Sequence, residues 1–458
     1  MKILLVQPDS SPQNVGFNNL TMPEPLHLEL VAGSVPEQDV RILDMRIDND
    51  LEASLREFQP DVLGVTGFTA DVPRAQIVCQ KTRKLLPSCR VVVGGHHASL
   101  RPEDFNLPSV DFIVVGEGEF TFPALIRALE EGSDLRLVTG LFYREDGRQV
   151  FTGARIPVKD LDQVLTPNRS LTEKYRSNYY FRFWHPTYTL ETARGCPYRC
   201  YFCSVWKFYQ GKCRTKSPER VFQELSGIPG DYVCFVDDNF MQDIKRAERI
   251  YQLVKEAGIH KKYWMQARTD SIARHPKVIE HWAEIGLSTI LVGFEKFREE
   301  ELATLNKKSS IALNERAVET MHKYGVDIWG AFIVDPAWGE EDFTALIDYV
   351  RAMKVDFPQF TILTPLPGTE FYTQKYDELL THEYGNFDFF HSVLPTKLPL
   401  REFYENMARL YANTSMSLSE LKNRIRRGDI PTESLKRMRG MLSQLTNPDA
   451  YLRGADTP

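Results

Sequence analysis

The fold is decided by residues 193–203, ARGCPYRCYFC, which place three thiols at a C-x3-C-x2-C spacing. Three thiolates on one short loop can hold three irons of a cubane cluster and leave the fourth iron without a protein ligand. An open coordination position on a metal is where a substrate or cofactor can bind and react. Structural zinc would need a fourth ligand, and only Cys213 is near enough in sequence to offer one. The spacing therefore favours an iron–sulfur centre with Cys196, Cys200 and Cys203 as its ligands.

The cysteine loop lies in a series of apolar runs that alternate with helical patterns from Thr189 onward. This alternation predicts a partial (β/α)6 barrel, similar to a TIM barrel, over residues 189–382. Barrel enzymes place working groups at the carboxyl ends of strands, where Arg268 follows the third expected strand and Glu295 ends the fourth. The strands expected after the cysteine loop are Tyr232–Val236, Tyr263–Ala267, Thr289–Gly293, Asp327–Val334 and Phe360–Leu363.

A second alternating series precedes the barrel and predicts an α/β domain over residues 1–137, with a doubly wound parallel sheet. Its expected strands are Ile3–Val6, Val40–Leu43, Val62–Thr66, Val91–Val93 and Phe112–Val115, and its expected helices are Leu51–Phe58, Arg74–Leu86 and Phe122–Glu131. Such sheets bind ligands at the carboxyl ends of their strands. The small and polar residues at these ends are Thr66, Gly94, Gly95, Ser99, Gly116 and Gly118. Taken one loop at a time, the glycines could equally serve only to end strands.

Two further regions complete the chain. Residues 138–188 lose the alternating rhythm and are expected to connect the domains, with a hairpin around residues 145–147. Residues 383–458 are expected to be mostly helical. The basic stretch in this region is interpreted as a solvated helical face and consists of Lys422, Arg424, Arg426, Arg427, Lys436, Arg437 and Arg439.

Composition excludes several classes of protein. The 458 residues include 56 Lys and Arg against 62 Asp and Glu, a formal charge of −6, so no global positive field favours nucleic acid as a partner. No run approaches the roughly 20 apolar residues of a membrane span, and the start does not resemble a signal peptide. We therefore expect a cytoplasmic protein without a membrane span.

Cys79, Cys89 and Cys234 lie in runs typical of helix or strand and are expected to be inert structural thiols.

The cysteine motif, with aromatic Phe202 just before the last thiol, resembles the signature of the radical S-adenosylmethionine (SAM) superfamily. The resemblance implies a [4Fe–4S] cluster that binds SAM at its free iron and cleaves it to a 5′-deoxyadenosyl radical. It also implies a reductant such as flavodoxin or ferredoxin. Arg268 and Glu295 become candidates for holding the carboxylate or ribose of SAM, although a charged pair that closes the barrel rim remains an alternative. Residues 365–369, PLPGT, resemble the loop that approaches the adenine.

Together with the preceding sheet and the loops GGHHAS (94–99) and GEGE (116–119), the chain resembles the cobalamin-binding subclass of this superfamily over roughly residues 1–380. The resemblance implies a corrinoid at the sheet's carboxyl edge, near Thr66, Ser99 and the glycine backbones named above. The loop after the first strand, residues 9–14, lacks the histidine that other cobalamin proteins supply to cobalt. We therefore expect His-off cobalamin, with His96 and His97 serving in packing or hydrogen bonding.

The leading functional hypothesis is a cobalamin-dependent radical SAM enzyme, a C-methyltransferase that methylates an unactivated carbon of a small molecule. Segment 203–208, CSVWKF, is similar to anaerobic tetrapyrrole cyclases and related hopanoid enzymes, so an oxidative cyclase or ring-modifying enzyme is the first alternative. The second alternative is that the first domain no longer binds cobalamin. The remaining alternative is a non-catalytic binding module. A large hydrophobic substrate could contact aromatic residues of the connector and tail, although core packing explains them equally well: Tyr179, Phe181, Trp184, Phe387, Phe389 and Phe390.

Overall fold

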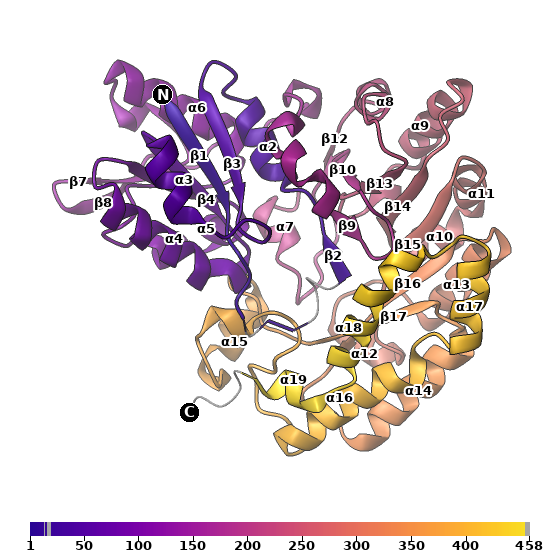
Figure 1. Ribbon diagram of the computed structural model, residues 1–458. Helices are drawn as coiled ribbons and strands as arrows, with labels where there is room; N and C mark the ends of the chain where they lie inside the picture. The colour runs from indigo at the N-terminus through magenta and orange to yellow at the C-terminus, as the bar shows by residue number, and fades with distance from the viewer. Residues whose placement is uncertain (13, 16–19, 454–458) are drawn as a thin grey trace. The chain divides into compact units, whose positions relative to one another are not determined.

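The computed structural model describes residues 1–12, 14–15 and 20–453 (Figure 1). They divide into two compact units, each of which is built from several segments of the chain. The first unit comprises Met1–Asn14, Glu24–Asn178 and Glu383–Phe387. The second comprises Val15–Pro23, Tyr179–His382 and Asp388–Pro458.

The first unit contains a sheet whose seven described strands follow the order β3-β1-β4-β5-β6-β7-β8. The first five of these pair in parallel, and their order is that of a doubly wound sheet of the flavodoxin type. Its strands are β1 (Lys2–Gln7), β3 (Asp39–Asp44), β4 (Val62–Thr66), β5 (Arg90–Gly94), β6 (Phe112–Val114), β7 (Leu141–Glu145) and β8 (Arg148–Phe151). Its helices are α2 (Leu26–Gly33), α3 (Leu51–Phe58), α4 (Val72–Leu85), α5 (His96–Leu100) and α6 (Gly118–Glu131).

Alternate residues along the parallel strands point to opposite faces of this sheet, and each face has its own apolar core. Leu4 and Val6 pack in one core with side chains of α3 and α4, whereas Ile3 and Leu5 pack in the other with side chains of α2 and α6. Helices therefore cover both faces, which confirms the predicted α/β architecture. The same packing explains why these strands read as nearly continuous apolar runs.

The hairpin expected around residues 145–147 is present, but its strands do more than connect the two domains. Asp146 and Gly147 both have positive φ, as a tight Asp-Gly hairpin turn requires. β7 pairs antiparallel with β6 and β8 with β7, so the expected connector extends the first sheet. Residues 179–188 instead belong to the second unit. β2 (Thr21–Met22) reaches that unit too, since it pairs with β9 (Tyr180–Phe181), a two-residue pairing that no local sequence pattern marks.

The second unit holds a sheet of parallel strands in the order β10-β13-β14-β15-β16-β17, as described over residues 188–362. This arrangement confirms the predicted partial barrel. β17 begins at Phe357, three residues earlier than expected, because an edge strand tolerates Pro358 without losing a ladder hydrogen bond. The strands are β10 (Tyr188–Leu190), β13 (Tyr232–Phe235), β14 (Lys262–Ala267), β15 (Leu287–Glu295), β16 (Asp327–Val334) and β17 (Phe357–Ile362).

Helices pack on the outer face of the barrel strands through one large apolar core. Phe235, Tyr263 and Trp282 meet there at ring-centre distances of 5.5 to 5.7 Å. The longer helices of this layer are α8 (Pro218–Ser226), α9 (Ile244–Glu256), α11 (Pro276–Glu284), α13 (Ile311–Lys323) and α14 (Glu340–Met353). The shorter helices of the second unit are α7 (Val205–Phe208), α10 (Thr269–Arg274), α12 (Glu299–Thr304) and α15 (Glu370–Lys375).

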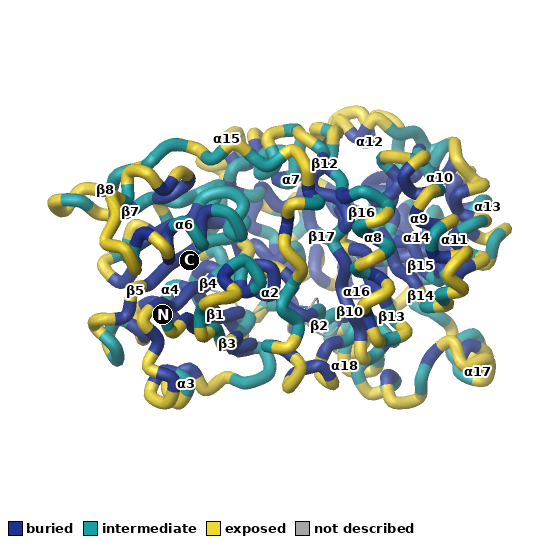
Figure 2. The backbone as a smooth tube through the Cα atoms, turned by 90° about the horizontal axis from the view of Figure 1, so that it is seen from above, coloured by how far each residue is buried: buried dark blue, intermediate teal, exposed yellow. Residues whose placement is uncertain are grey.

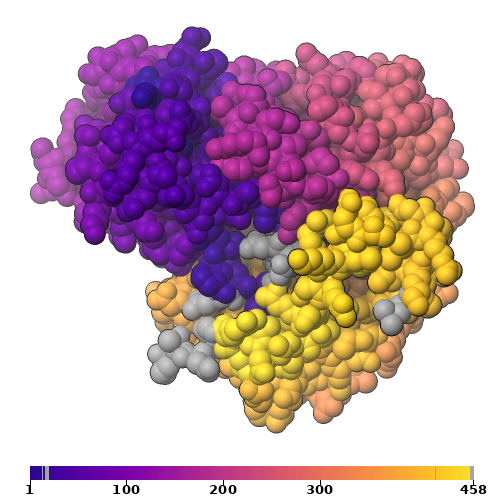
Figure 3. All heavy atoms as spheres, in the orientation of Figure 1, coloured from indigo at the N-terminus to yellow at the C-terminus, as the bar shows by residue number. Residues whose placement is uncertain are grey.

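The C-terminal region is helical, as expected, and joins the barrel core (yellow in Figure 3). It contains α16 (Leu400–Thr414), α17 (Leu418–Arg426), α18 (Leu435–Leu445) and α19 (Pro448–Leu452). Much of α17 is exposed (Figure 2), yet Arg424 is buried and pairs with Asp327 at 2.7 Å and Asp356 at 2.6 Å. The basic stretch is therefore not simply a solvated face. No described helix is both long and apolar enough to cross a bilayer.

Candidate functional site

The cysteine loop is held at its base by a short antiparallel ribbon, β11 (Ala193–Arg194) paired with β12 (Arg214–Thr215). Gly195 follows β11 with φ of +85°, and a Cβ there would lie 2.2 Å from the carbonyl oxygen of Lys212. Only glycine fits both this conformation and this close approach. The Ala-Arg-Gly-Cys start of the motif is thus a folding requirement of the loop.

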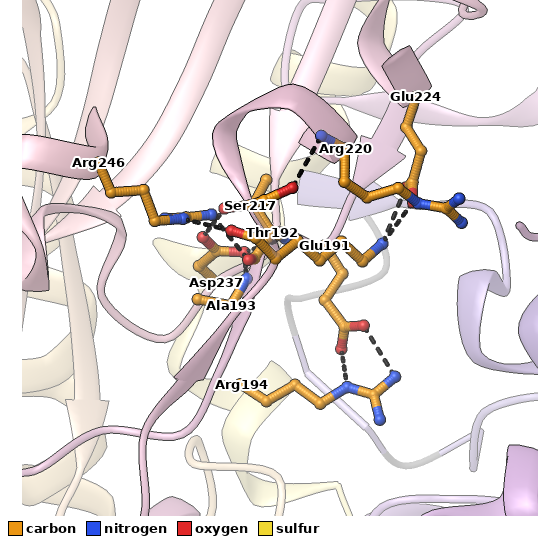
Figure 4. Close-up of polar contacts among 10 residues, drawn as sticks. Glu191, Thr192, Ala193, Arg194, Ser217, Arg220, Glu224, Asp237 and Arg246 are labelled. Atoms are coloured by element: carbon orange, nitrogen blue, oxygen red, sulfur yellow. Dashed lines mark hydrogen bonds and ion pairs between the residues drawn. The ribbon is translucent and has the colours of Figure 1, made fainter. Parts of the chain in front are cut away.

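Asp237, at the end of the second barrel strand, fixes the position of this ribbon (Figure 4). Its Oδ1 accepts hydrogen bonds from the backbone nitrogens of Thr192 at 2.6 Å and Ala193 at 2.9 Å, and its Oδ2 accepts one from the Thr192 hydroxyl. Arg246 of α9 donates to the carbonyl oxygens of Thr192 at 2.7 Å and Lys216 at 2.9 Å. Burial raises the pKa of Asp237, and these donors together with the Arg246 charge oppose that rise. The carboxylate is therefore a buried anchor for the segment that leads into the thiols.

Asp238 contacts the loop two residues nearer the thiols than Asp237 does. Its Oδ2 accepts a hydrogen bond from the Gly195 nitrogen at 3.1 Å, directly before Cys196. Burial raises the pKa of Asp238 to about 7. No role was assigned to Asp238 from the sequence. Adjacent carboxylates after an apolar strand were the available signal.

The three motif thiols lie in partly or fully buried surroundings. Burial raises the pKa of Cys196, Cys200 and Cys203, for Cys203 to about 12. Without a metal the thiols are therefore neutral at pH 7, and metal binding has to displace their protons. Cys213 donates its S–H to the Gly195 carbonyl oxygen at 3.4 Å.

Within the described part of the chain, no three or more His, Cys, Asp or Glu side chains converge on one point as the ligands of a single ion would. Thiolates that bind three different irons of a cubane do not need to converge in this way. The donor set itself, three cysteines on one glycine-initiated loop, fits a cluster with one iron left open to a further ligand. Phe202 packs beside this loop against an apolar group that includes Leu305 and Phe371.

Arg268 and Glu295, the two residues predicted to hold SAM, meet through Lys307. Glu295 Oε1 accepts from Lys307 Nζ at 2.6 Å, and Arg268 Nη2 donates to the Lys307 carbonyl oxygen at 2.7 Å. Arg268 also pairs with Asp270 at 2.9 Å and stacks 3.5 Å from the centre of the Tyr198 ring. Within the described part of the chain, Arg268 and Glu295 form no ion pair with each other: Glu295 pairs with Lys307 and Arg268 with Asp270, so the two residues are linked at the rim only through the Lys307 arrangement. A role in binding SAM is compatible with it and stays a prediction.

Lys307 is a residue that the sequence analysis missed. It lies in a loop whose Asn306 Nδ2 donates to the Arg199 carbonyl oxygen at 2.8 Å, so the loop packs directly on the cysteine motif. Burial raises the pKa of Cys200, and the charge of Lys307 opposes that rise. A Lys-Lys-Ser-Ser segment between two helices carries no signal by which this position could have been found.

The carboxyl edge of the first sheet brings several of its predicted residues together. Ser99 Oγ donates to the Gly95 carbonyl oxygen at 2.7 Å and accepts from the Gly116 nitrogen at 2.9 Å, so it joins the loops after β5 and β6. Gly95 has φ of +100°, and a Cβ there would lie 2.2 Å from Thr66 Oγ1. Gly94 pairs in register with Thr66. These contacts make one continuous rim from β4 to β6.

The same rim leaves room for a large ligand. At Gly116, with φ of +86°, nothing lies within 4 Å of where a Cβ would stand. Gly118 begins α6, and a Cβ on it would only touch Val31 at 3.4 Å. An open backbone at the carboxyl ends of the strands of a doubly wound sheet fits a bulky cofactor such as a corrinoid.

The histidines of the GGHHAS segment behave as the sequence predicted. His97 is buried, with Nδ1 3.1 Å from Thr69 Oγ1 and Nε2 3.0 Å from Asp104 Oδ2. Both ring nitrogens are therefore occupied within the protein. His96 contacts the ring of Phe68 at 5.8 Å between centres. In the loop after β1, Asp9 pairs with Arg74 of α4, and Gln13 lies outside the described residues.

The other cysteines and most of the aromatic residues named from the sequence lie in the core, with Phe181 and Trp184 as exceptions. Cys79, Cys89 and Cys234 are buried as expected, although Cys89 lies in the turn before β5 rather than within a helix or strand. Tyr179, Phe387 and Phe390 are core residues. Phe181 and Trp184, however, line a cavity at the amino end of the barrel.

Comparisons with known proteins agree with both halves of the chain. Residues 20–126 match the B12 binding domain family and residues 190–350 the Radical SAM superfamily. The chain is 31% identical to the hopanoid C-3 methylase of Methylococcus capsulatus over 89% of its own length and 79% of the relative's. It is 26% identical to an anaerobic magnesium-protoporphyrin IX monomethyl ester cyclase of Rubrivivax gelatinosus, over 84% and 72%. The fold also matches the radical SAM methyltransferase TsrM of Kitasatospora setae with a TM-score of 0.70, 17% identity and coverage of 99% of both chains.

The sheet with an open carboxyl rim and the barrel with three thiols at its mouth define a class of enzyme that uses SAM and a corrinoid together. The chain belongs to the cobalamin-dependent radical SAM family, among whose members are methyltransferases. Its cofactors are cobalamin, a [4Fe–4S] cluster and SAM.

Proposed function

We propose that this chain is a C-methyltransferase that methylates an unactivated carbon of a large, hydrophobic small molecule. The observation that carries the proposal is the presence, in one chain, of a three-thiol loop at the mouth of the barrel and an open corrinoid-type rim on the first sheet. The 31% identity to a hopanoid C-3 methylase supports both the methyl transfer and the hydrophobic class of substrate.

When bound, the cluster and SAM supply a radical that abstracts hydrogen, and cobalamin supplies the methyl group. The residues of this chain position these groups and exclude water. Cys196, Cys200 and Cys203 would hold the cluster, with Phe202 packed beside them. Arg268 and Glu295 would orient SAM through the charged contacts around Lys307. Asp237 keeps the loop at the strand end through the backbone of Thr192.

The rim of the first sheet would hold the corrinoid through backbone and small side chains. Thr66, Gly94, Gly95 and Ser99 shape the loops, and Gly116 and Gly118 provide the open approach. We propose that cobalamin binds without a histidine ligand, because both nitrogens of His97 already have partners. The loop of residues 9–14, which follows β1, contains no histidine.

A low-potential reductant is part of the proposal, because the cluster has to receive one electron for each radical formed. We propose a flavodoxin or ferredoxin in this role and a cytoplasmic location. The charge of −6 on the chain gives no reason to expect nucleic acid as a partner.

The proposal is tested by the co-products formed when reconstituted enzyme turns over with reductant and hydrophobic extracts. A methyltransferase consumes one SAM for the methyl group and another for the radical, so S-adenosylhomocysteine and 5′-deoxyadenosine should form in comparable amounts. The variant with Cys196, Cys200 and Cys203 all changed to Ala should bind no cluster and form no 5′-deoxyadenosine. Formation of 5′-deoxyadenosine without S-adenosylhomocysteine would instead favour the cyclase reaction that the name of the Rubrivivax relative describes.

A further inference from the structure

A cavity of about 420 Å³ lies inside the second unit, at the opposite end of the barrel from the cysteine loop. Its walls include Lys262, Asp327 and Phe357, which are the first residues of β14, β16 and β17. Arg268 and Glu295, in contrast, stand at the carboxyl ends of their strands. The amino end of a barrel ordinarily serves stability rather than catalysis, so a cavity of ligand size there needs its own explanation.

Aromatic side chains form one wall of the cavity, and charged and polar residues complete its lining. Trp264 and Phe357 belong to an apolar group distinct from the core between strands and helices, and Trp184 joins them from the segment before β10. Phe181 packs on Trp264 at 4.4 Å between ring centres. Planar, apolar walls of this kind suit a flat organic ligand.

Arg182 brings a positive charge into this aromatic wall. Its guanidinium carbon lies 3.5 Å from the centre of the Phe357 ring and 4.9 Å from those of Phe183 and Trp329. Stacking uses the face of a guanidinium and leaves the N–H groups along its edge free to donate. Among the described residues, however, no acceptor lies within hydrogen-bond distance of this group, and Nη1 is fully buried. The indole N–H of Trp264 is likewise buried without an acceptor there.

The backbone holds Arg182 in this place at a cost. Phe181 and Trp184 exchange both backbone hydrogen bonds at 3.0 Å, which puts Arg182 at the tip of a tight turn with φ of +53°. Glycine or asparagine is usual at such a position, and a long side chain there costs on the order of 1 kcal/mol. Its backbone N–H also donates to the Leu20 carbonyl oxygen at 2.7 Å. The turn therefore carries a charged side chain at a position where the backbone conformation alone would favour glycine.

The other charged residues around the cavity are two arginines and three aspartates, so they leave one negative charge, which Arg182 and Lys262 together exceed by one positive charge. Arg424 bridges Asp327 and Asp356, and Arg427 pairs with Asp429 at 3.5 Å. Burial lowers the pKa of Arg182 to about 9, so it remains charged at pH 7. Lys262, exposed at the start of β14, adds a further positive charge to the lining. An anion would complete this arrangement electrostatically.

We propose that this cavity is a second small-molecule site, which binds an organic anion with an oxyanion at Arg182 and a planar apolar body against Trp184 and Trp264. A carboxylate and a phosphate monoester both match the planar fork of arginine. The site lies at the end of the barrel opposite the cysteine loop, and the ligand is separate from SAM and from the substrate of methyl transfer.

The test uses reconstituted holoenzyme with saturating SAM, titrated calorimetrically with benzoate, phenyl phosphate and the neutral analogue benzamide. At least one anion should bind saturably, and benzamide should bind at least about tenfold more weakly because it cannot form the charge-assisted pair. Tighter binding of phenyl phosphate than of benzoate would assign a phosphate ligand, and the reverse order a carboxylate. Both orders support the site.

The variant R182Q should weaken binding of the anion at least about tenfold, whereas R249Q, which changes an exposed arginine on α9, should leave it unchanged. K262Q, at an exposed residue, gives a second variant if R182Q proves unfolded by circular dichroism, and it should also weaken binding. No saturable binding of either anion, equal binding of benzamide, or wild-type affinity in a folded R182Q variant would each overturn the proposal.

Discussion

Asp237 accepts a hydrogen bond from the Thr192 nitrogen at 2.6 Å and another from the Thr192 hydroxyl, 45 residues away in sequence. This pair ties the end of the second barrel strand to the segment that leads into the thiols. The position of the cysteine loop therefore depends on a buried carboxylate that does not itself contact the thiols. Local sequence around the cysteines cannot supply that restraint.

Changing Asp237 to Ala should lower the stability of the second unit by roughly 3 kcal/mol, because three donors and the Arg246 charge would lose a buried partner. The same variant should bind less iron on reconstitution, since the loop loses its anchor. Denaturant unfolding and iron analysis measure the two effects. Asp231→Ala, at an exposed position, is the matched control. Full iron content and unchanged stability in Asp237→Ala would contradict the anchoring role.

Changing Glu295 to Gln should weaken binding of SAM by about tenfold, because one charged partner of the Lys307 and Arg268 group is lost. Equilibrium binding of SAM to the reconstituted enzyme measures this effect. Glu300→Gln, an exposed change on α12, should bind SAM as the wild type does. A variant at Glu295 that loses stability yet binds SAM normally would show that the pair only closes the barrel rim.

The bound cobalamin, reduced to cob(II)alamin, should show no nitrogen coupling from an axial ligand in its electron paramagnetic resonance spectrum. Both His97 nitrogens are already engaged, by Thr69 and Asp104. Changing His97 to Ala should therefore lower stability without altering the cobalt signal. Resolved coupling that disappears in His97→Ala would refute the His-off assignment, and failure to bind any cobalamin would favour a first domain that only supports the barrel.

Stability should also depend on pH through His391, whose Nδ1 lies 3.0 Å from Asp388 and whose Nε2 lies 3.0 Å from the Arg453 carbonyl oxygen. Burial lowers the pKa of His391, but the hydrogen bond and charge of Asp388 outweigh it and raise the pKa above its ordinary 6.5. Because the folded pKa is the higher one, the stabilisation is complete below about pH 6.5 and is lost as pH rises through the folded value.

The stability difference between wild type and His391→Phe should accordingly be largest in acid, about 1–3 kcal/mol, and should shrink towards alkaline pH. Denaturant unfolding at several pH values gives this difference. His260→Gln, at an exposed histidine, serves as the control. A difference that grows with rising pH would contradict the charged pair.

Much of the fold could be predicted because its periodic elements are long and buried. α3 spans Leu51–Phe58 as expected, since Asp50 caps its start and its apolar spacing is regular. β2 and β9, by contrast, are two-residue strands that pair across 158 residues of sequence, and no local pattern specifies them. The same limit explains why Val15–Pro23 was not expected in the second unit.

The candidate site likewise contains residues that could be predicted from the sequence and residues that could not. The thiols and strand-end glycines could be found because their chemistry or conformation demands those residue types, as at Gly195. Lys307 and Arg182 could not, because each acquires its role only from distant partners in the fold. Arg424 was misjudged for the same reason, since its two carboxylate partners lie 97 and 68 residues away.

The most direct test of methyl transfer is turnover with SAM that carries a fully deuterated methyl group, followed by mass spectrometry of the product. Because the transferred methyl group originates from SAM, the product should contain deuterium at a newly methylated carbon, with S-adenosylhomocysteine and 5′-deoxyadenosine formed alongside it. A product that forms together with 5′-deoxyadenosine but contains no deuterium would contradict methylation and assign the chain a ring-forming or other radical reaction.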